Sequence, residues 1–100
     1  MHARVAAFDY SGSDPEDVGR GFDEIKRRAA AGPPEGLPAL RLLDLYNPND
    51  GKVLSITFFE TEEDLRQGDA TLSSMDPPRS GAMGRRVSVE MYEVAVKIDA

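Results

Sequence analysis

Apolar and polar positions alternate in some parts of the chain and recur at helical spacing in others. Residues 5–10 form a short apolar run with two aromatic side chains, closed by Ser-Gly-Ser, which is typical of a mostly buried strand. Asp14 and the proline after it then suit the start of a helix, and apolar residues recur every three or four positions from 18 to 29 until Gly32. The pattern predicts a strand followed by an amphipathic helix.

The middle of the chain is predicted to be a hairpin. Residues 40–46 and 52–60 are strand-like runs joined by the turn Asn-Pro-Asn-Asp-Gly. In the second run neither strand face is wholly polar: one carries Leu54, Ile56 and Phe58, and the other carries Val53, Ser55, Thr57 and Phe59. A sheet covered by helices on one side should have a solvated opposite face, so we expect a second layer there, which another copy of the protein would supply most easily.

A second helix and a final strand complete the pattern. Thr61 and Asp64 resemble a capping box, and an apolar helix face continues through residues 65–75. Residues 77–84 are predicted to form a loop, and residues 87–98 alternate as in a strand long enough to overhang its sheet. The order βαββαβ is that of the ferredoxin-like α+β fold with an antiparallel sheet, in one domain over residues 1–100.

Composition narrows the classes of partner and chemistry. A formal charge of −6 and a sequence pI near 4.7 argue against nucleic acid as a partner. The absence of cysteine excludes disulfides, thiolate metal sites and cysteine nucleophiles. No apolar run approaches the roughly 18 residues of a membrane span, and the first residues lack the apolar region of a signal peptide, so we expect a cytoplasmic protein with no membrane partner.

Three segments carry a resemblance to a known family: residues 1–5 (MHARV), 57–66 (TFFETEEDLR) and 87–96 (VSVEMYEVAV). They resemble the antibiotic-biosynthesis-monooxygenase-like (ABM-like) family of small dimeric α+β barrel proteins. The resemblance implies a homodimer formed through sheet faces, with a pocket in each subunit between its sheet and its helices. Some members oxidise phenols or quinols without a cofactor, some degrade haem, and many have no assigned activity.

The functional residues of that family have few counterparts in this chain. Haem-degrading relatives use an Asn, Trp and His set, whereas this chain has no Trp and a single imidazole, His2, so haem binding is disfavoured and no cofactor is implied. Quinone-forming relatives are associated with Trp, Asn and Tyr, and asparagine occurs here only in the hairpin turn. The tyrosines are therefore the residues that can still be matched.

The candidate catalytic residues are Tyr92, Tyr46 and Glu90. A tyrosine in a pocket could orient a phenolic substrate or donate a proton to it. Tyr92 shares a strand face with Glu90, and a pocket on that face would strip water from Glu90 and suit it to act as a base. The alternatives are a packed tyrosine with a satisfied hydroxyl, and a Glu90 that pairs with Arg4 or Arg86 or reaches solvent.

The candidate ligand-binding residues are mostly aromatic or carry hydroxyls: Phe8, Tyr10, Phe22, Ser55, Thr57, Phe59 and Met75. The large apolar side chains could wall a cavity for a flat ligand, and the hydroxyls of Ser55 and Thr57 could hydrogen-bond it. The alternative is ordinary core packing. No metal is implied, because the acidic residues 60–64 diverge around a helix start and serve as caps.

The sequence predicts a homodimer that binds a small apolar or aromatic molecule. The leading activity is cofactor-independent monooxygenation of an aromatic or quinol-type substrate. The alternative is a non-catalytic ligand-binding protein, or a structural or accessory dimer. Both alternatives stay open at this stage, together with which strand faces line a pocket and which form the dimer interface.

Overall fold

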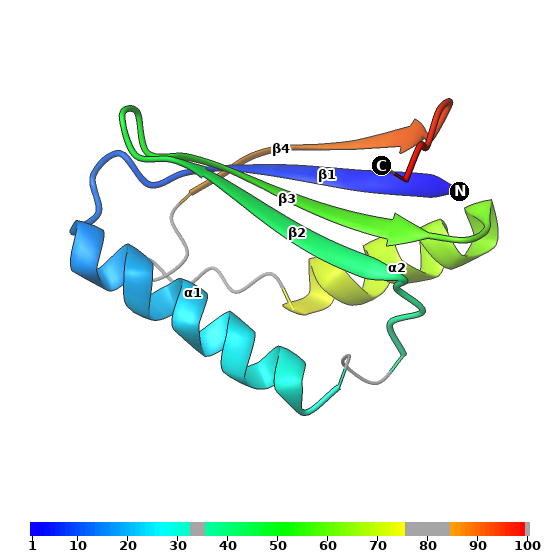
Figure 1. The fold of residues 1–100 in the computed structure, drawn as a ribbon, viewed down its shortest axis with the longest axis horizontal. Helices are drawn as coiled ribbons and strands as arrows, with labels where there is room; N and C mark the ends of the chain where they lie inside the picture. The colour runs from blue at the N-terminus through cyan, green and yellow to red at the C-terminus, as the bar shows by residue number, and fades with distance from the viewer. Residues whose placement is uncertain (33–35, 76–84, 100) are drawn as a thin grey trace.

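The computed structural model describes residues 1–32, 36–75 and 85–99. Within these ranges the elements follow the order βαββαβ predicted from the sequence (Figure 1). Their bounds are β1 His2–Asp9, α1 Pro15–Ala30, β2 Arg41–Asn47, β3 Lys52–Phe59, α2 Glu62–Met75 and β4 Arg85–Glu93. The fold is therefore α+β and ferredoxin-like, as expected.

The four strands form one antiparallel sheet in the order β2-β3-β1-β4. β1 lies in the interior of the sheet between β3 and β4, so the first and last strands of the chain are neighbours. Both helices lie on the same side of the sheet (Figure 1). We call this side the helix-facing side and the opposite side the outer face.

Strand pairing assigns each side chain to one of these two sides, since directly paired residues point the same way and alternate residues point opposite ways. Arg4 of β1 contacts Asp69 of α2, so Arg4 and its partner Thr57 lie on the helix-facing side. The same side carries Phe8, Leu42, Asp44, Tyr46, Val53, Ser55 and Phe59. The outer face carries Val5, Leu43, Leu45, Leu54, Ile56, Phe58, Ser88, Glu90 and Tyr92.

Local capping explains where the helices begin. Asp14 precedes α1, and its Oδ1 atom accepts a hydrogen bond from the backbone N–H of Glu16 at 2.8 Å. Thr61 precedes α2, and its hydroxyl oxygen accepts from the N–H of Asp64 at 3.0 Å, which confirms the predicted cap. Neither helix, nor any other in the described ranges, is long and apolar enough to cross a membrane.

The core beside α1 is small. Val18 of α1 is buried together with Tyr10 and Val53, and Phe8 and Phe22 pack against this group. Most of the other residues of α1 are exposed. The helix is therefore held to the sheet mainly through Val18 and Phe22.

The largest differences from the predicted strand bounds are at the start of β1 and at the end of β4. β1 begins at His2 rather than at residue 5, because residues 2–4 pair with β3 on one side and with β4 on the other. β4 ends at Glu93 rather than at residue 98, although the N–H of Val94 still donates to the carbonyl of Met1 at 2.9 Å. The predicted loop at residues 77–84 lies outside the described residues.

Candidate functional site

The helix-facing side of β2 holds a carboxyl group that is largely buried. Asp44 lies in the middle of the strand, directly opposite Ser55 of β3, and Leu42 and Tyr46 flank it on the same strand face. The Oδ1 atom of Asp44 is buried and has no hydrogen-bond partner among the described residues. Because an unpartnered buried polar atom is costly, this oxygen favours a further hydrogen-bond donor.

The surroundings of Asp44 and Tyr10 favour the protonated form of each side chain. Burial raises the pKa of the Asp44 carboxyl above its ordinary value of 3.8, and a hydrogen bond with the Ser55 side chain opposes that rise. Tyr10 is also buried, and its pKa is raised to about 12, first by burial and then by the charge of Asp44. Tyr10 is therefore a neutral phenol at physiological pH and keeps its proton for donation.

Three aromatic rings connect β1, α1 and β2 beside this carboxyl. Phe22 stacks on Tyr10, with ring centroids 6.3 Å apart and planes at 8° to each other. Phe22 also tilts against Tyr46, with centroids 5.6 Å apart. Tyr46 is 38% exposed, so it lies at the rim of the cluster. We call the group formed by Asp44, Ser55, Tyr10, Phe22 and Tyr46 the Asp44 site.

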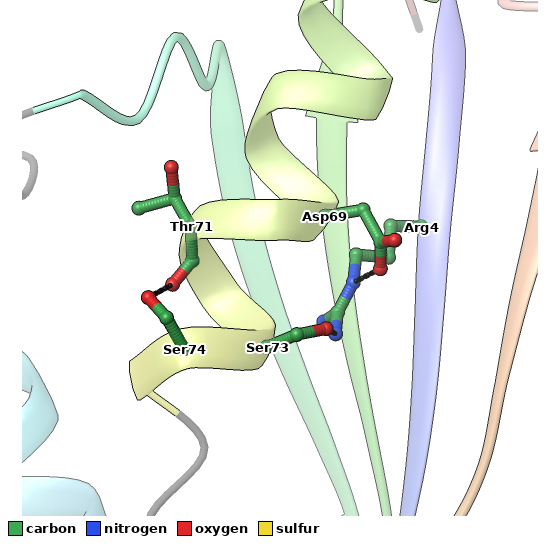
Figure 2. A network of polar contacts seen from close by, with 5 residues as sticks. All are labelled: Arg4, Asp69, Thr71, Ser73 and Ser74. Atoms are coloured by element: carbon green, nitrogen blue, oxygen red, sulfur yellow. Dashed lines mark hydrogen bonds and ion pairs between the residues drawn. The ribbon is translucent and has the colours of Figure 1, made fainter.

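A buried ion pair lies on the same side of the sheet, under α2. The Nε atom of Arg4 donates to Oδ1 of Asp69 at 2.9 Å, and Nη2 lies 3.5 Å from the hydroxyl oxygen of Ser73 (Figure 2). Arg4 is buried, and its strand partner Thr57 is buried beside it. Asp69 thus compensates the charge of Arg4. We interpret the contacts of Arg4 with α2 as structural, because they hold this helix against the sheet.

The structure brings four of the predicted site residues into the Asp44 site: Tyr46, Tyr10, Phe22 and Ser55. Phe8 packs next to them. Thr57 and Phe59 lie farther along β3 on the same side, where Phe59 packs against Gly68 of α2. Met75 is the last residue of α2, and its side chain lies outside the described residues.

Tyr92 and Glu90 lie on the outer face instead. Tyr92 is half exposed, and a hydrogen bond with the Glu90 carboxylate raises the pKa of its phenol. The sheet stands between this pair and Tyr46, so the three predicted catalytic residues do not come together in one site of the folded chain. A catalytic role for Tyr92 and Glu90 stays a prediction, and it would require a ligand on the outer face.

Asp44 is the site residue that the sequence reasoning missed. The available signal was a single acidic residue inside the run LLDLY, since a charged residue is rarely buried without a reason. Within the described ranges, no group of three or more His, Cys, Asp or Glu side chains could hold a metal ion.

Comparisons of the sequence and of the structure give different results. No model of a protein family matches the sequence, and no curated protein matches it. The structure matches that of a MhuD variant crystallised with two manganese protoporphyrin IX molecules per active site, with a TM-score of 0.62 at 13% sequence identity over 100% of both chains.

Two further matches come from proteins assigned as antibiotic biosynthesis monooxygenases. The one from Deinococcus radiodurans has a TM-score of 0.59 at 10% identity, over 100% of this chain and 98% of its own. The one from Chloroflexus aurantiacus has a TM-score of 0.57 at 8% identity, over 99% and 96%. At such identities the likeness is one of fold. The structure therefore confirms, at the level of the fold, the resemblance of this chain to the antibiotic-biosynthesis-monooxygenase-like proteins.

Proposed function

We propose that the protein binds a small aromatic molecule at the Asp44 site, between the sheet and α1. The observation that carries this proposal is the buried oxygen of Asp44, which lacks a hydrogen-bond partner in the described part of the chain, in the same cluster as the rings of Tyr10, Phe22 and Tyr46. Ligand sites typically combine apolar and aromatic walls with a few placed polar groups, and this cluster has both. The half-buried ring of Tyr46 offers a face against which a flat ligand can stack.

The chemistry that suits this site best is cofactor-independent monooxygenation of an aromatic or quinol-type substrate. In such a reaction the protein excludes water and stabilises a substrate phenolate or carbanion while dioxygen reacts. The pKa of Tyr10 is raised to about 12, so its hydroxyl is protonated at physiological pH and can donate a hydrogen bond to developing negative charge. The solved structures assigned as monooxygenases share the fold, which supports this choice.

The proposal includes a homodimer formed through the outer faces of two sheets. Leu43 and Leu45 of β2 are exposed on that face. Beyond β4, Val96 and Ile98 are 75% and 82% exposed, although their alternating pattern is that of a strand. Exposed apolar side chains on a sheet face can serve as an interaction surface, and a two-fold axis would let the same face serve both subunits.

Binding and oxygen uptake test the proposal together. We expect naphthols and hydroquinones to bind the purified protein, and at least one of them to consume dioxygen in an oxygen-electrode assay. Tyr10→Phe and Tyr46→Phe should each lower binding or turnover while the far-ultraviolet circular dichroism spectrum stays unchanged. Tyr92→Phe tests the outer face: a loss of turnover in this variant alone would move the site there. Failure of every aromatic probe to bind would refute the proposal.

A non-catalytic ligand-binding or accessory dimer is the second candidate. Quinone-forming relatives are associated with Asn and Trp as well as Tyr, and the Asp44 site includes no asparagine. Asn47 and Asn49 belong to the hairpin end of β2 and its turn. The chain also has no Trp. Binding of an aromatic probe without oxygen uptake, for every probe tested, would support this candidate.

Haem does not fit the residues present. His2, the only imidazole, lies at the start of β1 opposite Phe59, at the far end of the sheet from Tyr46. A tyrosine ligand to iron is a phenolate, whereas burial and the charge of Asp44 raise the pKa of Tyr10 to about 12 and so disfavour that form. We therefore expect that adding haem to the protein leaves the Soret band of free haem unshifted.

A further inference from the structure

We propose that Asp44 selects the ligand by accepting a hydrogen bond from a hydroxyl group on its aromatic ring, so that phenols bind in preference to ring compounds without a donor. This inference rests on the proposed function, because it concerns the same Asp44 site. It adds the chemical feature that the ligand must carry and the residue that recognises it.

The position of the Asp44 carboxyl is set by the sheet. β2 is hydrogen-bonded to β3 along its whole length, with Asp44 at the middle pair of the register and Ser55 directly opposite. The Ser55 side chain interacts with the carboxyl, yet Oδ1 keeps no partner within the described residues. Among the described residues this oxygen is thus left without a donor, and a ligand hydroxyl would supply one.

Within residues 1–32, 36–75 and 85–99, the groups found to interact with the Asp44 carboxyl are the Ser55 side chain and the phenol of Tyr10, and neither is a cation. From α1, the half-buried side chain that meets the cluster is the ring of Phe22. A donor on the ligand is therefore the interaction that would relieve the cost of burying this group.

A neutral hydroxyl fits these surroundings better than an ammonium group does. Burial raises the pKa of Asp44, which means that the surroundings disfavour charge. An ammonium ligand would bring a second ion into the same apolar setting and would pay its own desolvation cost. A phenol brings the donor without the charge, and its ring can pack against Tyr46 and Phe22.

Two probes that differ by one methyl group test the inference: 2-naphthol and 2-methoxynaphthalene. The intact protein should bind 2-naphthol roughly tenfold more tightly or better, because a hydrogen bond to a carboxylate discriminates by about this factor. Asp44→Ala should bring the ratio of the two dissociation constants close to one. Asp44→Asn, which keeps the size of the side chain, should give a ratio in between.

Asp23→Ala is the matched control. It removes one carboxylate from the exposed side of α1, next to Phe22 in sequence, and should leave the ratio at its original value. A ratio that stays unchanged in Asp44→Ala and Asp44→Asn would overturn the inference while the proposed function stands, as would equal binding of both probes by the intact protein. Tighter binding of 2-naphthylmethylamine than of 2-naphthol would overturn it in favour of a cationic ligand. Failure of the intact protein to bind any probe would overturn both proposals.

Discussion

Gly68 of α2 lies directly against the ring of Phe59 in β3. A Cβ atom added at Gly68 would overlap the Cε1 and Cζ atoms of that ring and stand 3.2 Å from Cδ1. Phe59 is completely buried, so its ring has no open space into which to turn. The missing side chain at position 68 is what lets α2 approach the sheet this closely.

Replacing Gly68 by alanine should destabilise the protein. Overpacking against an enclosed ring costs about 1–3 kcal/mol, which at this degree of overlap exceeds the gain in helix propensity. Urea unfolding followed by circular dichroism measures the change in the free energy of unfolding. Gly19→Ala in α1 is the control, since its Cβ would meet no atom within 4 Å, and it should stabilise by up to about 1 kcal/mol. Changes of the same sign at both positions would contradict the close approach of α2.

The ion pair between Arg4 and Asp69 should matter more than an exposed pair on the same helix. Asp69→Ala leaves a buried guanidinium without its carboxylate, and because Asp69 is 32% exposed we expect a loss of about 1–3 kcal/mol. Glu62→Ala breaks the exposed pair with Arg66 and should cost less than about 0.5 kcal/mol. Thermal and urea unfolding of the two variants make the comparison.

A double variant separates two effects of Asp69→Ala: the loss of the ion-pair attraction, and the uncompensated charge of the buried Arg4 guanidinium. Adding Arg4→Met to Asp69→Ala removes the guanidinium and should recover most of the stability, because an apolar side chain of similar length does not need a partner. If the double variant is less stable than Asp69→Ala alone, the packing of the Arg4 stem dominates instead.

The order of elements could be predicted because each element carries its own local signal. Asp14 and Thr61 cap helices through bonds that lie within three residues, so their roles are visible in the sequence. Strand ends carry no such local signal, because they depend on the neighbouring strands. β1 extends back to His2 because β3 and β4 both pair with it, and the residues opposite His2 lie some 60 and 90 positions away along the chain.

The site was harder to predict for a related reason. Alternation shows that Tyr92 shares a face with Glu90, but it does not say which face of the sheet the helices cover. The register placed Tyr46 under α1 and Tyr92 on the other side. Asp44 looked like an ordinary charged residue because its burial depends on residues from β3 and α1, which come together only in the folded chain.

The stability of Asp44→Asn relative to the unaltered protein should rise with pH. Burial raises the pKa of Asp44 in the folded state above its ordinary value of 3.8, which applies to the unfolded chain. At pH values between 3.8 and the pKa of the folded state, the folded protein therefore holds a proton that the unfolded chain has lost. The unaltered protein therefore loses stability as pH rises through this window, and the variant does not. Urea unfolding from about pH 3 to about pH 8 should show a growing difference that reaches a plateau.

Asp9→Asn should behave in the opposite way. The backbone N–H of Ser11 donates to Asp9 at 2.8 Å, and this bond lowers the pKa of its carboxyl. The stability from this carboxylate is present above its unfolded pKa and is lost as the pH falls, so Asp9→Asn should be the less stable protein at neutral pH.

If the difference in unfolding free energy between Asp44→Asn and the unaltered protein does not change with pH, the burial of the Asp44 carboxyl is contradicted.

Leu43 and Leu42 are neighbours in β2 that point to opposite sides of the sheet, and they are similarly exposed, at 43% and 46%. If two copies associate through their outer faces, Leu43→Glu places a charge inside the interface, whereas Leu42→Glu places it on the helix-facing side. Light scattering after gel filtration should then find Leu43→Glu as a monomer and Leu42→Glu as a dimer. Dissociation by Leu42→Glu alone would put the interface on the helix-facing side, because a buried, unpaired carboxylate is the most disruptive group that a single substitution can introduce there.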